Sequence, residues 1–171
     1  CKRNRKINSL NLENTHNIYF IGIGGIGMSS LALYFKSIGK NVAGYDKTPS
    51  EITISLQQKS IEVHFEDSID FISNEYKNKE NTLVIYTPAV PKNHTELNFF
   101  FNNNFTVLKR SEILGEITKN SICLAVAGTH GKTTTSTMLG HILSEAGVNA
   151  TSFLGGVSEN YNSMKSRFGI R

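Results

Sequence analysis

Two glycine-rich loops constrain this chain more than any other feature, because each follows a short apolar run and precedes a helical pattern. The first, Gly22–Gly27, follows Asn17–Ile21, whose apolar, β-branched and aromatic residues are typical of a buried parallel strand. The second, Gly128–Thr134, follows the apolar run 121–127. Free backbone N–H groups at the start of a helix form a phosphate-binding site. The sequence therefore predicts an α/β fold with two phosphate-binding loops.

The pattern around these loops predicts a Rossmann-like parallel sheet. Residues Met28 to Ile38 have apolar side chains at helical spacing, and Gly39 is a helix stop signal. Val42–Tyr45 follows as a strand, and a strand, helix and strand in this order imply a parallel pair with a right-handed crossover. Further strands are predicted at Thr82–Tyr86, Phe105–Leu108 and Ser121–Ala127, and further helices at Ser111–Ile117, capped by Ser111, and at Lys132–Glu145, which stops near Gly147.

The second strand, loop and helix begin a new unit, so we expect a domain boundary between Leu108 and Asn120. We expect residues 1–10 to form a disordered basic leader, 11–108 a Rossmann-like domain, and 109–171 the beginning of a P-loop ATP-binding central domain. That central domain is expected to be truncated, because one strand, one helix and a short following segment are too little for a complete core. The first residue is Cys1 and not methionine, so we also expect the natural start to be absent.

Charge and cysteine content argue against several classes of protein. The net charge of +4 arises from four basic residues between Lys2 and Lys6, and charges cancel from Ile7 onward, so no nucleic-acid-binding face is predicted. No run approaches the roughly 18 to 20 apolar residues of a membrane span. Cys1 and Cys123 are too few for a disulfide framework or a zinc site, which favours a reducing, cytoplasmic environment.

The loop Gly128–Thr134 carries groups that can bind ATP and Mg²⁺. Lys132 would reach the β- and γ-phosphates, Thr133 would offer its hydroxyl to Mg²⁺, and Thr134 is the next candidate metal ligand. Val126 stands where the general P-loop pattern has its first glycine, so a plain strand-to-helix turn with a surface lysine is the alternative. The residues expected to contact ATP are Gly128, Thr129, His130, Gly131, Lys132, Thr133 and Thr134, with His130 mainly shaping the turn.

The loop Gly22–Gly27 satisfies the pattern G-x-G-x-x-G between a strand and a helix, which is typical of a dinucleotide site. Asp46 ends the second strand, where an acidic residue often binds a ribose hydroxyl. An NAD-binding oxidoreductase is therefore one hypothesis, and glycines that serve only helix–sheet packing are another. The lysine loop speaks against a dehydrogenase, because an enzyme that brings ATP to a diphosphate-bearing substrate needs two phosphate loops.

Four segments in this order resemble the Mur ligase family. They are Gly22–Ala32 (GIGGIGMSSLA), Tyr86–Val90 (YTPAV), Ala127–Thr135 (AGTHGKTTT) and Leu154–Gly156 (LGG). The resemblance runs from about Asn11 to Asn162, and the combination is more specific than any one segment. It implies that residues 11–108 bind a UDP-linked sugar acid, with glycine-loop amides on the diphosphate. The residues implied for this site are Gly22, Gly24, Gly25, Ile26, Gly27, Asp46, Thr87, Pro88 and Ala89.

The resemblance also implies a reaction. ATP phosphorylates the carboxylate of UDP-N-acetylmuramate, the amine of L-alanine attacks the acyl phosphate, and phosphate leaves, with Lys132 stabilising charge on the transferred group. The family's acidic metal-binding segment, a histidine and a third domain are expected beyond Arg171, so this chain alone should lack ligase activity. Alternatives are a family member that reattaches a tripeptide to UDP-N-acetylmuramate, and a nucleotide-binding module without catalysis.

Other conspicuous residues are expected to be structural. The histidines outside the ATP loop lack metal-ligand spacing and should lie at the surface or pack against helices. Cys123 lies in a predicted apolar strand and is expected to be an inert core thiol. Phe99–Phe101 are expected to pack in the core, because no basic residues interleave with them.

Overall fold

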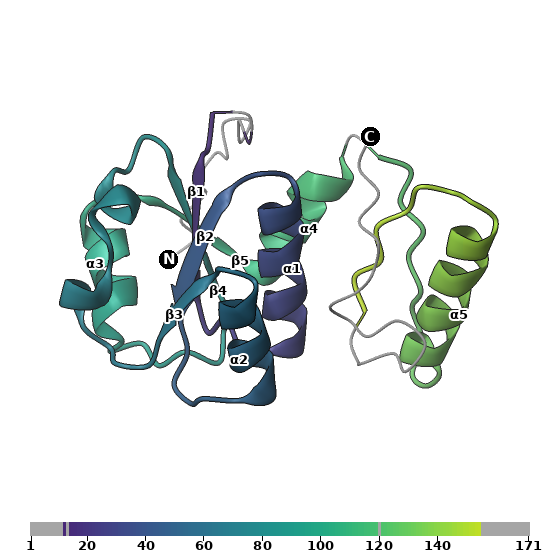
Figure 1. Ribbon diagram of the computed structural model, residues 1–171, viewed down its shortest axis with the longest axis horizontal. Coiled ribbons are helices and arrows are strands. Elements are labelled where there is room, and N and C mark those ends of the chain that lie inside the picture. Colours follow the sequence, from purple (N-terminus) through teal and green to yellow (C-terminus); the bar gives the residue numbers. More distant parts are fainter. Residues whose placement is uncertain (1–11, 13, 120, 155–171) are drawn as a thin grey trace.

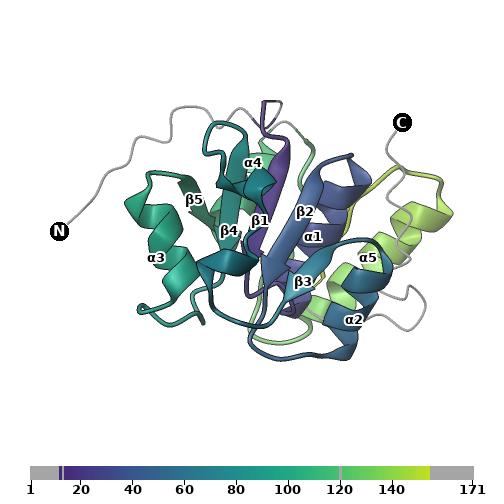
Figure 2. The ribbon, with the colours of Figure 1, turned by 60° about the vertical axis from the view of Figure 1, so that its left-hand side comes forward.

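The computed structural model describes residues 12, 14–119 and 121–154, and its central feature is a five-stranded parallel sheet (Figure 1). The order across the sheet is β3-β2-β1-β4-β5, and all neighbouring strands are parallel (Figure 2). This arrangement confirms the predicted Rossmann-like α/β fold. The strands are β1 Asn17–Ile21, β2 Asn41–Tyr45, β3 Glu62–His64, β4 Thr82–Tyr86 and β5 Thr106–Lys109.

Helices cover both faces of the sheet (Figure 1). One face carries α1, α2 and α4, and the other carries α3 with two short 3₁₀ turns, η1 and η2. None of the helices in the described part of the chain is both long and apolar enough to cross a membrane. The helical segments are α1 Ile26–Ser37, α2 Glu51–Gln58, η1 Ile69–Phe71, η2 Asn74–Lys77, α3 Thr95–Asn102, α4 Arg110–Thr118 and α5 Lys132–Glu145.

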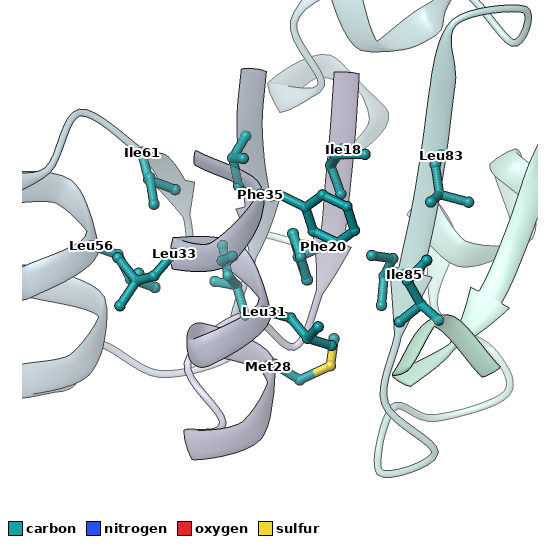
Figure 3. Packing of buried hydrophobic residues seen from close by; sticks show 14 of the residues in the cluster. Ile18, Phe20, Met28, Leu31, Leu33, Phe35, Leu56, Ile61, Leu83 and Ile85 are labelled. Carbon is teal, nitrogen blue, oxygen red and sulfur yellow. The ribbon is translucent and has the colours of Figure 1, made fainter. Parts of the chain in front are cut away.

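The central strand β1 is buried on both faces, as its apolar sequence predicts. Alternate side chains of a strand point to opposite faces, so Ile18 and Phe20 contribute to the α1 side while Tyr19 contributes to the α3 side. Phe20 and Phe35 are fully buried with ring centroids 6.4 Å apart (Figure 3). This packing fixes β1 and α1 on each side of the glycine loop that joins them.

The predicted end of α1 is confirmed. Gly39 has a left-handed φ of +80°, and its N–H donates to the Lys36 carbonyl at 3.1 Å. The Lys40 N–H donates to the Phe35 carbonyl at 3.0 Å, which satisfies a further carbonyl of the last turn. The helix therefore stops where the sequence predicts, and the chain returns directly into β2.

Helix α4 packs on the first unit, because Ile113 is fully buried in the same core as Leu108. This helix lies between Leu108 and Asn120, the stretch in which the domain boundary is predicted. The predicted cap at Ser111 is wrong. Lys109 precedes the helix, and its N–H donates to a Glu112 carboxylate oxygen at 2.6 Å, while Ser111 is exposed within the first turn.

The strand predicted at Ser121–Ala127 does not form in the structure. A strand is held by hydrogen bonds to a neighbouring strand, and among the described residues this segment pairs with no other strand. Cys123 is consequently exposed, so the prediction of a buried core thiol is wrong. Helix α5 is confirmed at Lys132–Glu145, and Gly147 follows it with a φ of +72°.

The sequence prediction lacked α2, β3 and α3, and it also lacked the two 3₁₀ turns η1 and η2. Helix α2 begins with a capping box in which the Ser50 and Thr53 side chains each accept the other's backbone N–H. The expectation that Phe99–Phe101 pack in the core is confirmed, because Phe100 is fully buried and its two neighbours pack against the same cluster on α3.

Candidate functional site

The carboxyl ends of the parallel strands form one edge of the sheet, at the lower end of Figure 1. Strands β1 and β4 are neighbours there, but the chain leaves β1 toward β2 on one side and leaves β4 toward β5 on the other. Ligands of open α/β sheets bind at such a topological switch point, outside the strand ends. The first glycine loop, Asp46 and Thr87–Ala89 all follow strands at this edge, so the structure brings the predicted substrate residues together.

The glycine loop after β1 is closely fitted to its neighbours. The N–H groups of Gly22 and Ile23 both donate to the Tyr45 carbonyl, at 2.8 and 3.0 Å. Gly22 has a φ of +85°, and a Cβ placed on it would lie 2.6 Å from Thr87 Cγ2. Only glycine satisfies both the left-handed backbone and this close approach. The first glycine of the pattern therefore shapes the loop, and its amide is already used.

The Gly24 amide is also engaged, because it donates to Asp46 Oδ2 at 2.6 Å. The other oxygen of Asp46 accepts the Thr48 N–H at 3.2 Å. Asp46 thus braces the glycine loop against the end of β2. The amides of Gly25, Ile26 and Gly27 have no acceptor in the described part of the chain. These three amides at the N-terminus of α1 are the ones left for an anion.

The loop after β4 forms a turn beside the glycine loop. Thr87 donates its N–H to the Ile21 carbonyl at 3.3 Å, and Val90 donates to the Thr87 carbonyl at 3.2 Å. Pro88 and Ala89 lie at the exposed tip of this turn. The turn and the glycine loop therefore lie side by side at the switch point.

The predicted ATP loop precedes α5 and is exposed. Gly131 caps the helix with a left-handed φ of +75°, and the Thr135 N–H donates to its carbonyl at 2.9 Å. Lys132 folds back over the loop, where its Nζ donates to the Gly128 and Thr129 carbonyls at 2.6 and 2.9 Å. The lysine is thus held beside the amides that would bind phosphate, together with exposed His130 and with Thr133 and Thr134 in the first turn.

Arg110 lies against the first glycine loop, and the sequence prediction did not include it. It is the first residue of α4, directly after β5, and its guanidinium lies over Gly27. A Cβ placed on Gly27 would overlap Arg110 Nη1 and lie 3.0 Å from its Cζ. The only available signal was a basic residue two positions after the strand predicted at Phe105–Leu108, because 83 positions separate Arg110 from Gly27 in the sequence.

A buried polar cluster on the α3 side of the same edge was also missed. Tyr19 Oη lies 2.6 Å from His64 Nε2 and 2.9 Å from Glu96 Oε2. His94 Nδ1 lies 3.1 Å from an oxygen of Asp67, whose carboxylate also accepts two N–H groups at the start of α3. Burial raises the pKa of Glu96 to about 8 and lowers the pKa of both histidines. In the described ranges, no three His, Cys, Asp or Glu residues form a group able to hold a metal ion.

The fold and the loops define a doubly wound α/β protein with glycine-rich loops before two of its helices. The model of the Mur ligase family, catalytic domain, matches residues 17–121, which is more than half of the chain. The chain therefore belongs to the Mur ligase family. This membership leaves the NAD-binding oxidoreductase hypothesis without support.

Curated and solved relatives agree with this assignment. The chain is 64% identical over 154 residues to UDP-N-acetylmuramate–L-alanine ligase of Flavobacterium psychrophilum, covering 90% of the chain and 34% of the relative. The corresponding ligase of Flavobacterium johnsoniae is 58% identical, with the same shares covered. The chain thus spans about a third of the length of these relatives.

Two solved structures match most of the chain. The UDP-N-acetylmuramate–alanine ligase of Thermotoga maritima has a TM-score of 0.76 at 33% identity, with 86% of this chain and 33% of that chain covered. A ligase from Neisseria meningitides for UDP-N-acetylmuramate and L-alanyl-γ-D-glutamyl-meso-diaminopimelate has the same TM-score at 29% identity, with 86% and 45% covered. Both likenesses support the Rossmann-like architecture.

Proposed function

We propose that this chain contributes the UDP-substrate site and the ATP loop of a cytoplasmic ATP-dependent ligase that joins L-alanine to UDP-N-acetylmuramate in peptidoglycan precursor synthesis. The proposal rests on two glycine loops in a member of the Mur ligase family, whose amides at the helix starts have no acceptor among the described residues. Curated relatives at 49–64% identity are named for L-alanine. The tripeptide-type ligase structure is 29% identical, so L-alanine is the favoured amino acid over the tripeptide.

The two loops would bind different ligands, the first the UDP-linked substrate and the second ATP. Residues 11–108 would bind the UDP part, with the amides of Gly25, Ile26 and Gly27 on the diphosphate. Asp46 holds the Gly24 amide, so we propose that it shapes the loop and flanks the uridine together with the turn at Thr87–Ala89. Residues 109–171 would begin the ATP-binding part, after α4 has packed on the first unit.

On the ATP side, Lys132 would leave the carbonyls of its own loop and donate to the β- and γ-phosphates. Mg²⁺ fits the residues present only through hydroxyl oxygens, because the loop offers Thr133 and Thr134 and no carboxylate. When bound, the ion would neutralise charge on the phosphates. The helix N-terminus of α5 adds positive potential at the same place.

The proposed reaction uses these groups in sequence. A carboxylate oxygen of the sugar acid attacks the γ-phosphorus of ATP, the bond to the β-phosphate oxygen breaks, and ADP leaves. The amine of L-alanine then attacks the acyl carbon, loses a proton, and inorganic phosphate departs. Lys132 would stabilise the charge that develops on the transferred phosphoryl group. The amides at Gly25–Gly27 would hold the substrate without taking part in bond making.

Ligand-dependent thermal unfolding tests the substrate site. A ligand that binds only the folded state raises the melting temperature, so UDP-N-acetylmuramate should stabilise the chain and NADH should not. Stabilisation by NADH alone would overturn the proposal.

The same assay tests the ATP loop. Lys132→Ala should abolish stabilisation by Mg-ATP while leaving that by UDP-N-acetylmuramate intact. Lys119→Ala, at an exposed lysine paired with Glu116, is the matched control and should retain both responses. Loss of ATP binding in the control but not in Lys132→Ala would remove the lysine from the site.

We also propose that the chain alone lacks part of the active site, since it spans about a third of its relatives. With UDP-N-acetylmuramate, Mg-ATP and L-alanine, a phosphate-release assay should show no turnover. Steady release that depends on all three substrates would show that the described loops suffice.

A further inference from the structure

The position of Arg110 is unusual for a residue that serves only stability. It is the first residue of α4, and its guanidinium also lies over Gly27, in the first turn of α1. The N-terminus of a helix carries partial positive charge, so cations there are unfavourable. Arg110 therefore places a full positive charge at the N-termini of two helices at once.

No anion within the described residues compensates this charge. Arg110 is exposed and has neither an ion pair nor a side-chain hydrogen bond there. The nearby acidic groups are engaged elsewhere, because Glu112 accepts the Lys109 N–H at 2.6 Å and Asp46 accepts the N–H groups of Gly24 and Thr48. The guanidinium and the amides of Gly25–Gly27 are thus a cluster of hydrogen-bond donors that has no acceptor among the described residues.

The backbone at residue 27 leaves room for this arrangement. A Cβ at that position would overlap Arg110 Nη1 and lie 3.4 Å from Cδ, so any other residue would displace the arginine. The third glycine of such a loop usually serves helix–sheet packing. Here the space beside Gly27 is occupied by the side chain from α4.

We infer that Arg110 is a substrate-binding residue whose guanidinium binds the diphosphate of the UDP-linked substrate, opposite the amides of the first glycine loop. The inference rests on the proposed function and extends it. A guanidinium offers planar, paired donors that match two oxygens of a phosphate group, and it is always charged. A bound diphosphate would supply the negative charge that the arginine and the two helix N-termini otherwise lack. Substrate binding would then also connect α1 to α4, the helix that leads toward the ATP loop.

Isothermal titration with UDP-N-acetylmuramate, UDP and UMP tests this inference. Loss of a charge-assisted hydrogen bond typically weakens binding between about tenfold and a hundredfold. Arg110→Gln should lose that much affinity for both diphosphate ligands and less for UMP, and Arg110→Lys should fall between. Lys109→Gln removes the same charge one residue away and should change affinity less than about threefold.

Gly27→Ala provides a second, coupled measurement. In the wild-type background, the added methyl displaces Arg110 and should weaken diphosphate binding about as much as Arg110→Gln. In the Arg110→Gln background, it should cause little further loss, because the displaced group is already gone. Additive losses would overturn the proposed relation between the two residues.

Unfolding of the ligand-free variants separates binding from structure. A structural arginine would lower the melting temperature when replaced, whereas the inferred role predicts an Arg110→Gln melting temperature equal to or above that of the wild type. If the wild type binds the diphosphate ligands and Arg110→Gln binds them equally well, the inferred role of Arg110 is refuted and the proposed function still stands. Absence of any wild-type binding to UDP-N-acetylmuramate and UDP would refute the proposed function together with this inference.

Discussion

Replacing Glu96 by glutamine should remove a large part of the pH dependence of folding stability above neutral pH. Glu96 is fully buried, and its Oε2 lies 2.9 Å from Tyr19 Oη. His64 Nε2 approaches its other oxygen at 3.4 Å. Burial, with a contribution from Asp67, raises the Glu96 pKa from 4.5 to about 8. The folded protein therefore holds this carboxyl in its protonated form at neutral pH.

The sign of the effect follows from proton binding. A carboxyl with a raised pKa binds more protons in the folded state, so its contribution to stability is complete below pH 4.5 and is lost as pH rises through about 8. One such group changes the free energy of unfolding by at most about 1.4 kcal/mol per pH unit. His64 and His94 have lowered pKa values and act in the opposite direction, since their contribution is lost as pH falls through the acid range. Both are neutral above pH 7, where the effect of Glu96 can be measured alone.

Urea unfolding at pH 7, 8 and 9 provides the measurement. Relative to Glu96→Gln, the wild type should lose about 1 kcal/mol between pH 7 and pH 8 and little more above that range. Glu80→Gln removes an exposed carboxyl and should follow the wild type at each pH. Parallel curves for the wild type and Glu96→Gln would refute the argument, because they would show that Glu96 does not titrate between these values.

Two further substitutions test the packing around the first loop. Gly22→Ala should lower the free energy of unfolding by more than about 1 kcal/mol, because of the left-handed backbone and the approach of Thr87 Cγ2. Adding Thr87→Ser to this variant removes that methyl and should recover part of the lost stability. An unchanged urea midpoint for Gly22→Ala would contradict the close contact. Phe35→Ala should lower the free energy of unfolding by about 3 to 5 kcal/mol, because a fully buried ring is lost. Phe71→Ala removes a side chain that is 45% exposed and should lower it much less. Equal losses of stability in the two variants would place Phe35 outside the core.

The parts of the fold that could be predicted are those with continuous apolar runs next to glycine. Strands β1, β2 and β4 are buried in the centre of the sheet, so their sequences carry a clear signal. Strand β3 is a short edge strand with one buried residue, Val63, and such a run cannot be distinguished from a loop. The segment Ser121–Ala127 shows the opposite error, since apolar residues favour a strand but only a neighbouring strand can supply its hydrogen bonds.

The candidate site divides in the same way. Residues within one loop, such as Gly22–Gly27, could be predicted because local spacing is enough to define the loop. Asp46 was predicted near the ligand, but its hydrogen bond to the Gly24 amide depends on how β2 lies beside β1. Arg110 comes to lie beside Gly27, and Glu96 beside Tyr19 and His64, only through the order of strands and the packing of α4 and α3. Contacts of this kind depend on tertiary structure, for which a single sequence holds no periodic signal.

The two hydrogen bonds of Lys132 have a consequence for the entropy of the nucleotide binding proposed for this loop. A free lysine side chain samples many rotamers, and ordering it costs up to about 2 kcal/mol. Here the ammonium is already held by the carbonyls of Gly128 and Thr129, so much of that ordering has occurred before a nucleotide arrives. We expect binding to exchange one set of acceptors for another without immobilising a freely moving chain, which is a form of preorganisation. In the absence of nucleotide, the same two hydrogen bonds join the start of α5 to the exposed loop before it.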